Sequence, residues 1–317
     1  MIYKLIASVI VDVLFKRPTK RNIAKIDKKI IANLKNSGED DLADTFSRAD
    51  ESLSSYSPEE VYVKSFDGTV LFARYFPAPE PQDLTFVLLH GYKGSGGRNF
   101  ILQFELLRKL GCNILMIDQR AHGKSGGKYI TFGVKEQYDV EAWVNWLRSL
   151  NPNVRIVLYG VSMGASTALI ASSIPSVSQN LSAIIADCGF TSPAEEFVNL
   201  AEFKGKKAPK KFLTESVEVV RKKADFLTTA YSTLDSVSKM NVPVLFVHGE
   251  KDKFVSPSFT VRNYEACSSP YKRLLMVHDA QHVGSFQHAP EQYTEEIKAL
   301  LSRIRPSEAP LTEDGSS

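Results

Sequence analysis

Cysteine is scarce in this sequence: only three of its 317 residues are cysteines, namely Cys112, Cys188 and Cys267. An odd number of widely spaced cysteines does not make a disulfide framework, so we expect reduced core thiols and a cytoplasmic protein. Excess charge of one sign is missing as well. The formal net charge of +3 excludes the strongly basic surface of a nucleic-acid-binding protein, and we expect no nucleic-acid partner.

The residue spacings that hold metals and nucleotides are also absent. The chain has no H-x-H, H-E-x-x-H or C-x-x-C segment, which argues against a metal site. Its glycine-rich segment GYKGSGG lacks the G-K-[ST] of a Walker loop and the G-x-G-x-x-G of a dinucleotide site. We therefore expect an activity that needs no cofactor.

Long hydrophobic runs are missing too. The apolar N-terminal segment MIYKLIASVIVDVLF is interrupted by Lys4 and Asp12 and falls short of the ~20 residues that span a bilayer. No small-residue cleavage site follows it, so we expect no secretory signal. Its apolar residues recur at helical spacing and predict one apolar face: Ile2, Leu5, Ile6, Val9, Ile10, Val13 and Leu14.

A basic run follows this segment, made up of Lys16, Arg17, Lys20, Arg21, Lys25, Lys28 and Lys29. Two interpretations stay open. The helix packs on the protein's own surface, or residues 1–29 bind peripherally to an anionic membrane, on its inner face. The pattern does not determine the oligomeric state.

What the sequence does contain is a regular alternation of apolar strands and amphipathic helices. After a hairpin that turns at Asp67-Gly68, buried strands are predicted over 84–90, 113–118, 155–160, 181–187, 242–249 and 273–279. Helices are predicted between them, over 99–110, 134–150, 162–174, 258–267 and 290–303. This rhythm indicates an α/β fold with a mostly parallel central sheet flanked by helices.

The rhythm breaks once, after the sixth strand. Residues 189–237 contain lysine-rich, helix-like sequence without a buried strand, and we expect a helical cap over the carboxyl edge of the sheet. The predicted organisation is a helical N-terminal extension over 1–59, a catalytic domain over 60–304 that includes the cap, and a disordered polar tail over 305–317.

One short segment indicates chemistry. Gly160-Val161-Ser162-Met163-Gly164 fits G-x-S-x-G and lies between a buried strand and a helix. The tight turn there presents the Ser162 hydroxyl at the sheet edge, at a helix N-terminus that favours developing negative charge. A serine hydroxyl needs a base to become a good nucleophile. We therefore look for a histidine and a carboxylate at later sheet-edge positions.

Both occur. Asp252 follows the strand VLFVHG, and His282 follows the last strand, giving the order Ser162, Asp252, His282. In this arrangement His282 accepts the Ser162 proton and Asp252 orients the imidazole. An oxyanion hole would use the backbone N–H groups of Met163 and Tyr92, the latter in the loop after the strand TFVLLH.

Rival candidates stay open at this stage. Asp187 also ends a strand and competes with Asp252 as the acid, and His288 competes with His282 as the base. Cys188 competes with Ser162 as the nucleophile. His90 and His248 are interpreted as structural residues. Asp118, Arg120 and His122 are interpreted as structural or pocket-rim residues without a direct chemical role.

Five motifs in order carry a family resemblance: LLHGYKGSGG, DQRAHGKSGG, YGVSMG, VHGEKDKFV and QHVGSF. Together they resemble the α/β-hydrolase superfamily, and most closely its bacterial esterase and serine-aminopeptidase-like branch, related to prolyl oligopeptidase catalytic domains. The resemblance covers about 60–301. It implies an α/β-hydrolase fold with a Ser162, Asp252, His282 triad.

The triad and the resemblance predict a serine hydrolase that cleaves small-molecule carboxylic esters through an acyl-enzyme on Ser162. Alternatives are an aminopeptidase-like serine peptidase, an acyl-thioesterase, or a non-catalytic ligand-binding member. For a peptidase, a free substrate amine would be held by cap acids such as Glu195, Glu196 and Glu202. For a thioesterase, an anionic acyl carrier would be attracted by cap lysines: Lys204, Lys206, Lys207, Lys210 and Lys211.

Overall fold

The computed structural model describes residues 2–203 and 210–304. The predicted tail over 305–317 lies outside these ranges, as do Lys204, Lys206 and Lys207. The side chains of Glu202, Lys210 and Lys211 are also outside the description.

The centre of the molecule is an eight-stranded sheet in the order β1-β2-β4-β3-β5-β6-β7-β8. The strands β3 to β8 pair in parallel. The hairpin β1–β2 forms one edge of the sheet, where β2 pairs antiparallel with both β1 and β4. The bounds are β1 Glu59–Lys64, β2 Val70–Phe76, β3 Leu84–Leu89, β4 Asn113–Asp118, β5 Arg155–Val161, β6 Leu181–Asp187, β7 Val244–Gly249 and β8 Lys272–Val277. Each predicted strand is therefore present, within two residues at each end.

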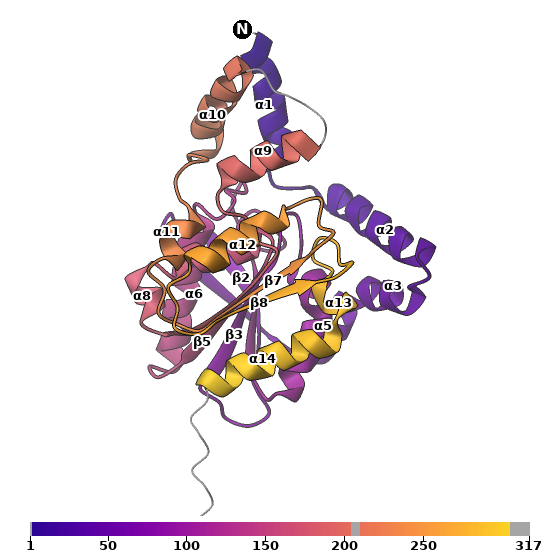
Figure 1. Cartoon of the computed structure of the whole chain (residues 1–317), viewed down its shortest axis with the longest axis vertical. Coiled ribbons are helices and arrows are strands. Elements are labelled where there is room, and N and C mark those ends of the chain that lie inside the picture. The colour runs from indigo at the N-terminus through magenta and orange to yellow at the C-terminus, as the bar shows by residue number, and fades with distance from the viewer. Residues whose placement is uncertain (1, 204–209, 305–317) are drawn as a thin grey trace, which may run out of the picture.

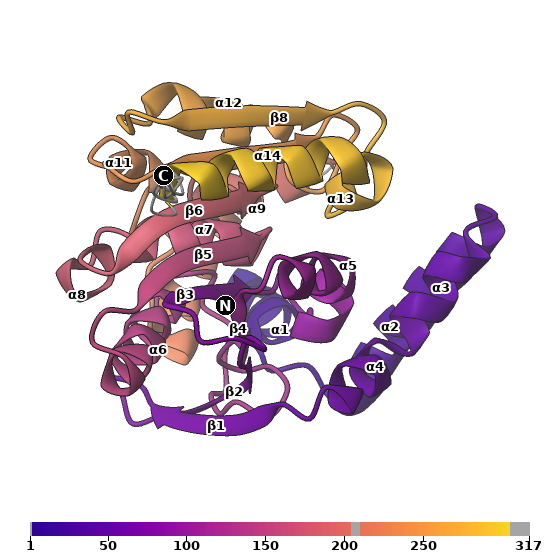
Figure 2. The ribbon, with the colours of Figure 1, turned by 90° about the horizontal axis from the view of Figure 1, so that it is seen from below.

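Helices cover both faces of the sheet. Successive side chains of a strand point to opposite faces, and the buried strands are apolar on both, so each face needs a covering layer. In β3, Phe86 and Leu88 pack into the core on one face, and Val87 and Leu89 into the core on the other. Figures 1 and 2 show the sheet between the two helix layers. The first layer contains α5 Gly96–Lys109, α13 Ser285–His288 and α14 Pro290–Ile304; the second contains α6 Glu136–Leu150, α7 Met163–Ala171, α8 Pro175–Ser178, α11 Thr233–Val237 and α12 Pro257–Ala266.

The chain between β6 and β7 forms the expected helical insertion, with α9 Pro193–Phe203 and α10 Lys210–Ala224 leading to α11. Together with α1 Ile2–Phe15, the helices α9 and α10 stand above the body of the sheet (Figure 1). Three more helices precede β1: α2 Lys20–Asn36, α3 Asp40–Ser47 and α4 Ala49–Ser55. Leu53 of α4 inserts into the core beside α5.

Helix α1 packs on the protein's own surface, but not through the apolar face that the periodicity predicted. Ala7, Val11 and Phe15 are buried, and they pack with α10 and α9. Most of the predicted face lies in solvent instead: Leu5, Ile6, Val9, Ile10 and Val13 are exposed. The reason is that α1 is apolar on nearly all sides, so its periodicity could not specify which side is buried. Among the described residues, no helix combines the length and the apolar character needed to cross a bilayer.

Candidate active site

Ser162 lies on the turn between β5 and α7 in a backbone conformation that non-glycine residues rarely adopt, with φ 54° and ψ −121°. The turn is held by the Ser162 N–H, which donates to the Asp187 carbonyl at 2.8 Å. A Cβ on Gly160 would overlap the Gly164 backbone, and a Cβ on Gly164 would overlap the Leu89 carbonyl. Both glycines are therefore required by the close approach of α7 to the strands.

The structure brings Ser162, Asp252 and His282 into one hydrogen-bonded chain. His282 Nδ1 lies 2.7 Å from Asp252 Oδ2, and His282 Nε2 lies 3.0 Å from Ser162 Oγ. Because a carboxylate only accepts, Nδ1 carries the proton and Nε2 is free to accept the Ser162 hydroxyl. The three side chains follow β5, β7 and β8, so they meet at the carboxyl edge of the sheet.

Asp252 keeps its charge although it is only 5% exposed. Its Oδ1 accepts the backbone N–H groups of Phe254 and Val255 at 2.8 and 2.9 Å. Its Oδ2 accepts His282 and also His248 Nε2, the latter at 3.1 Å. Burial raises the pKa of Asp252, but the hydrogen bonds from His248 and His282 outweigh it and hold the pKa well below the ordinary range. The carboxylate can therefore stabilise a positive charge on His282.

His248 contacts Asp252 of the site, and the sequence did not predict this contact. We interpreted it as structural, and it is fully buried at the end of β7. Its Nε2 faces two acceptors, Asp252 Oδ2 and the Val255 carbonyl at 3.1 Å, so this nitrogen carries a proton. The Thr260 hydroxyl lies 2.6 Å from its other ring nitrogen and fixes the ring. The sequence did contain one signal: His248 lies near the end of β7, and Asp252 lies in the turn that follows this strand.

The rival acid and base make other contacts. The Asp187 carboxylate accepts the hydroxyls of Ser285 and Tyr293 at 3.2 and 3.1 Å, and burial raises its pKa. His288 is exposed on α13, and its Nδ1 contacts the Gly284 carbonyl at 3.0 Å. Within the described part of the chain, neither the Asp187 carboxylate nor the His288 ring hydrogen-bonds the Ser162 hydroxyl or the His282 ring.

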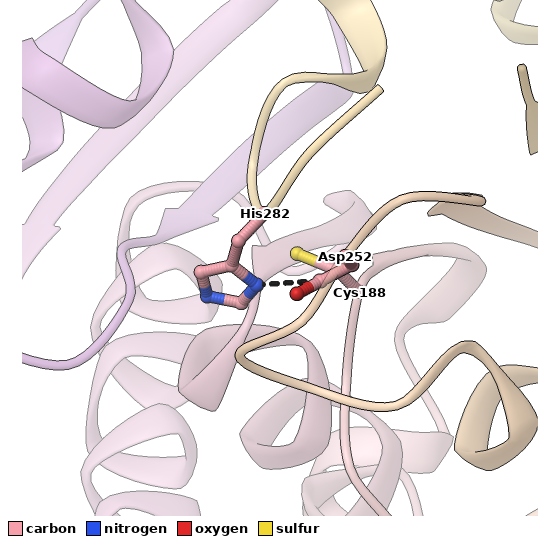
Figure 3. Close-up of side chains that lie close together, drawn as sticks. All are labelled: Cys188, Asp252 and His282. Carbon is pink, nitrogen blue, oxygen red and sulfur yellow. Dashed lines mark hydrogen bonds and ion pairs between the residues drawn. The ribbon is translucent and has the colours of Figure 1, made fainter. Parts of the chain in front are cut away.

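Cys188 lies beside the pair formed by Asp252 and His282 (Figure 3). Its sulfur, a carboxylate oxygen of Asp252 and a ring nitrogen of His282 all lie within 4.8 Å of one another. Burial, with the nearby charges of Asp187 and Asp252, raises the pKa of the Cys188 thiol well above its usual value. A metal ligand or nucleophile must be a thiolate, so this environment suits neither role.

The two N–H groups predicted for an oxyanion hole lie at the same edge of the sheet. Tyr92 belongs to the loop after β3, and Met163 is the first residue of α7. Among the described residues, none accepts a hydrogen bond from either N–H. Such donors remain free for a developing oxyanion.

Two buried histidines hold the loop that carries Tyr92. His90 Nε2 accepts the Gln119 N–H at 3.0 Å, and His122 Nε2 accepts the Lys93 N–H at 3.0 Å. Desolvation lowers the pKa of both rings, so both are neutral and can accept these bonds. Their role agrees with the structural interpretation from the sequence.

Asp118 and Arg120 also make structural contacts. The Asp118 carboxylate accepts the Lys124 N–H at 2.8 Å. Arg120 donates to both oxygens of buried Asp139, at 2.7 and 2.6 Å, and to Asp67 at 2.9 Å. This ion pair joins the β1–β2 hairpin to α6 and to the chain after β4.

An apolar cluster, which we call the cap cluster, encloses the side chain of Met163, the residue after Ser162. Phe132 lies 5.0 Å from Tyr92 and 5.1 Å from Phe197, between ring centroids, and Phe15 of α1 lies 5.4 Å from Phe132. The cap cluster consists of Ala7, Val11, Phe15, Ala121, Ile130, Phe132, Met163, Phe190, Val219, Val220, Ala224, Phe226, Val255 and Phe259. The residue next to the serine is therefore packed among apolar and aromatic side chains.

Glu196 of α9 is the exception to this apolar environment. It is 1% exposed, and its Oε1 is without a hydrogen-bond partner among the described residues. Its Oε2 accepts the Asn199 amide at 3.2 Å. Burial, with the charge of Asp252, raises the pKa of Glu196 to about 9, so the group is protonated at neutral pH.

Comparison with known proteins agrees with this architecture. Residues 85–218 match the protein family described as the alpha/beta hydrolase fold. The esterase Pf2001 of Pyrococcus furiosus superposes with a TM-score of 0.64 and 27% identity, covering 80% of this chain and 94% of the esterase. The chain has the α/β-hydrolase fold, and these two likenesses support a hydrolase.

Two further likenesses say less about activity, because one protein is uncharacterised and the other is more distant in sequence. An uncharacterised protein of Bacillus subtilis, YqkD, is 29% identical over 236 residues, which cover 74% of this chain and 76% of YqkD. An esterase of Exiguobacterium antarcticum superposes with a TM-score of 0.58 and 20% identity, covering 77% of this chain and 100% of the esterase. At this identity the likeness shows the fold alone. Together these likenesses support a hydrolase, while the finer esterase and aminopeptidase-like branch stays a prediction.

Proposed function

We propose that this α/β-hydrolase is a serine carboxylesterase that acts on esters of apolar acyl groups through an acyl-enzyme on Ser162. One observation carries the proposal: Asp252, His282 and Ser162 form a continuous hydrogen-bonded chain with contacts of 2.7 and 3.0 Å. The apolar cap cluster around Met163 supports an apolar acyl group. The likeness to an esterase at 27% identity supports ester substrates.

The proposed reaction begins when Ser162 Oγ attacks the ester carbonyl carbon and its proton passes to His282 Nε2. The carbonyl oxygen becomes an oxyanion and accepts hydrogen bonds from the Tyr92 and Met163 N–H groups. Collapse of this intermediate breaks the bond to the alcohol, which leaves with the proton from His282. Asp252 stabilises the imidazolium throughout by its negative charge.

The second half restores the serine. A water molecule attacks the acyl-enzyme carbonyl and gives one proton to His282 Nε2. The tetrahedral intermediate then releases the carboxylic acid, and His282 returns the proton to Ser162 Oγ. Since water supplies both the hydroxyl of the acid and the returned proton, no cofactor enters the balance.

Replacing Ser162 tests this proposal directly. We expect Ser162→Ala to lower turnover of p-nitrophenyl esters by about 10⁴-fold or more and to abolish labelling by a fluorophosphonate probe, because the attacking oxygen is removed. The matched control is Ser178→Ala, an exposed serine on α8. Persistent labelling of the Ser162→Ala protein would exclude the proposed nucleophile.

A substrate panel separates the alternatives that the sequence left open. We expect p-nitrophenyl esters of medium-chain acids to be hydrolysed faster than matched thioesters or aminoacyl anilides. Faster turnover of the anilides would favour the peptidase, and faster turnover of the thioesters the thioesterase. Well-folded protein that reacts with no probe or substrate would favour the non-catalytic alternative.

A further inference from the structure

Helix α1 has one face that the protein covers. Ala7, Val11 and Phe15 are buried in the cap cluster, next to Val219 and Val220 of α10. A polar seam closes this contact: Lys223 Nζ pairs with the Asp12 carboxylate at 2.8 Å and donates to the Ser8 carbonyl at 3.1 Å. The packing of α1 is thus complete on this side.

The opposite face of α1 is apolar and uncovered. We call it the exposed apolar face, and its five residues are 38–68% exposed: Leu5, Ile6, Val9, Ile10 and Val13. Leu5, Val9 and Val13 follow one another at i, i+4 spacing, so they form a continuous row along the helix. Helices α1 and α10 project together from the body of the molecule, where this row can reach a large surface (Figure 1). An uncovered apolar row of this kind marks an interaction site.

The chain around this face is strongly basic. Residues 1–29 contain eight basic and two acidic side chains, although the whole chain has a net charge of only +3. Both acids are already paired within the protein, Asp12 with Lys223 and Asp27 with Arg98. The basic side chains that lie exposed in this segment are Lys16, Lys20, Arg21, Lys25, Lys28 and Lys29. A partner for this region is therefore expected to be apolar and anionic together.

Helix α1 is also held rigidly to the body of the protein. The Tyr92 hydroxyl donates to the Leu14 carbonyl at 2.6 Å, and Lys93 Nζ donates to the Val13 carbonyl at 2.9 Å. At the last residue of the helix, the Phe15 carbonyl accepts the Ile130 N–H at 2.6 Å. These bonds fix the orientation of the exposed apolar face, so docking needs little reordering.

We propose that the exposed apolar face docks α1 in the interface of an anionic lipid bilayer, with the helix axis lying in the membrane plane. The basic residues of α2 and of the α1–α2 connection supply attraction to anionic headgroups. The 14 residues of α1 extend over about 21 Å, short of the ~30 Å hydrocarbon core, so the helix lies on the membrane and does not cross it. Docking of a second copy is disfavoured, because it would bring two strongly basic segments together.

Vesicle flotation of the intact protein tests this proposal. We expect flotation with phosphatidylcholine vesicles that contain about 30% phosphatidylserine, weak flotation with phosphatidylcholine alone, and a loss when salt rises from about 0.1 to about 0.5 M. The binding is measured without turnover, so its failure and a failure of the proposed esterase activity are distinguishable.

Two sets of substitutions locate the docking surface. The triple variant Leu5→Gln, Val9→Gln, Val13→Gln is expected to reduce vesicle binding by about tenfold or more. The reason is that three apolar side chains that would transfer from water into the bilayer are replaced by polar ones. A matched control replaces exposed apolar residues elsewhere by glutamine, at Tyr62, Val70 and Leu150. All six side chains are solvent-exposed, so circular dichroism should show folded protein in both variants.

Three results would overturn the proposal. These are equal flotation of the two triple variants, absence of flotation with anionic vesicles, and a dimer in light scattering that the α1 variant converts to monomer. The last result would assign the exposed apolar face to a second copy of this chain.

Discussion

At the scale of single residues, Glu196 shows how burial sets a protonation state. Its carboxyl group is buried near Asp252, and one of its oxygens has no hydrogen-bond partner among the described residues. Burial raises the pKa of this group to about 9. The unfolded chain exposes this group to water, where a glutamate has a pKa of about 4.3. The folded protein therefore holds a proton that the unfolded chain releases.

The sign of the resulting pH dependence follows from linkage. Between about pH 4.5 and 9 the folded state binds more protons at this position, so stability falls as pH rises, by up to ~1.4 kcal/mol per unit. We expect Glu196→Gln to flatten this slope and to differ little from the parent protein at pH 5. At pH 8.5, which is 3.5 units higher, the variant should be more stable than the parent by up to ~5 kcal/mol. Urea unfolding across this range measures the effect.

The neighbouring residue offers a matched control. Glu195 pairs with Arg262 at 2.5 Å, and this hydrogen bond lowers the pKa of Glu195. Glu195→Gln should therefore leave the slope between pH 5 and 9 unchanged. Identical slopes for the two variants and the parent would contradict the protonation state assigned to Glu196.

At the scale of elements, the turn between β5 and α7 depends on close backbone approach. A methyl group at Gly164 would meet the carbonyl groups of Leu89 and His90, which belong to β3 and its following loop. Backbone atoms in the middle of a sheet cannot move aside cheaply. The position of α7, and with it the position of Ser162, therefore depends on the absence of a side chain at residue 164.

The substitution Gly164→Ala should therefore lower the free energy of unfolding by about 3 kcal/mol or more. It should also lower the proposed esterase turnover, because Ser162 is displaced with α7. The measurement is urea denaturation followed by circular dichroism. Gly38→Ala serves for comparison, because Gly38 has φ 78° and open space around it, and only about 1 kcal/mol of backbone strain is expected there. A Gly164→Ala protein as stable as Gly38→Ala would show that α7 can shift.

Elements were the level at which the sequence was most informative. Each buried strand was predicted from its own residues, because a strand covered on both faces must be apolar along its length, as in β3. The insertion after β6 was also predicted, from the absence of a buried strand there. The face of α1 was predicted wrongly. This helix is apolar on most of its sides, so the buried side was chosen by packing against the neighbouring α10.

At the scale of the whole molecule, α1 contacts both the cap helices and the loop that follows β3. Phe15 lies 5.2 Å from Phe197 of α9 and 5.6 Å from Phe226, between ring centroids. The preceding residue, Leu14, accepts the hydroxyl of Tyr92, which belongs to the proposed oxyanion loop. The N-terminal helix thus supports both the cap and the loop beside Ser162.

Phe15→Ala should therefore cost about 3 kcal/mol of stability and should also slow fluorophosphonate labelling of Ser162, because the loop with Tyr92 loses its support. Rates of labelling and thermal unfolding measure the two effects. Phe66→Ala is a suitable control, since Phe66 is 60% exposed and is not a member of the cap cluster. Labelling at an unchanged rate in Phe15→Ala would separate α1 from the active site.

The sequence by itself determined which segments are strands and helices, and it indicated the order of Ser162, Asp252 and His282. These features depend on short windows of apolar periodicity and on the chain order of sheet-edge positions. The tertiary structure decided which side chains meet across long separations. Only packing shows that His248 donates to Asp252, that Glu196 is enclosed near it, and that α1 leaves an apolar row in solvent. The physical reason is that such contacts are set by the joint packing of several elements, and no single window of sequence contains them.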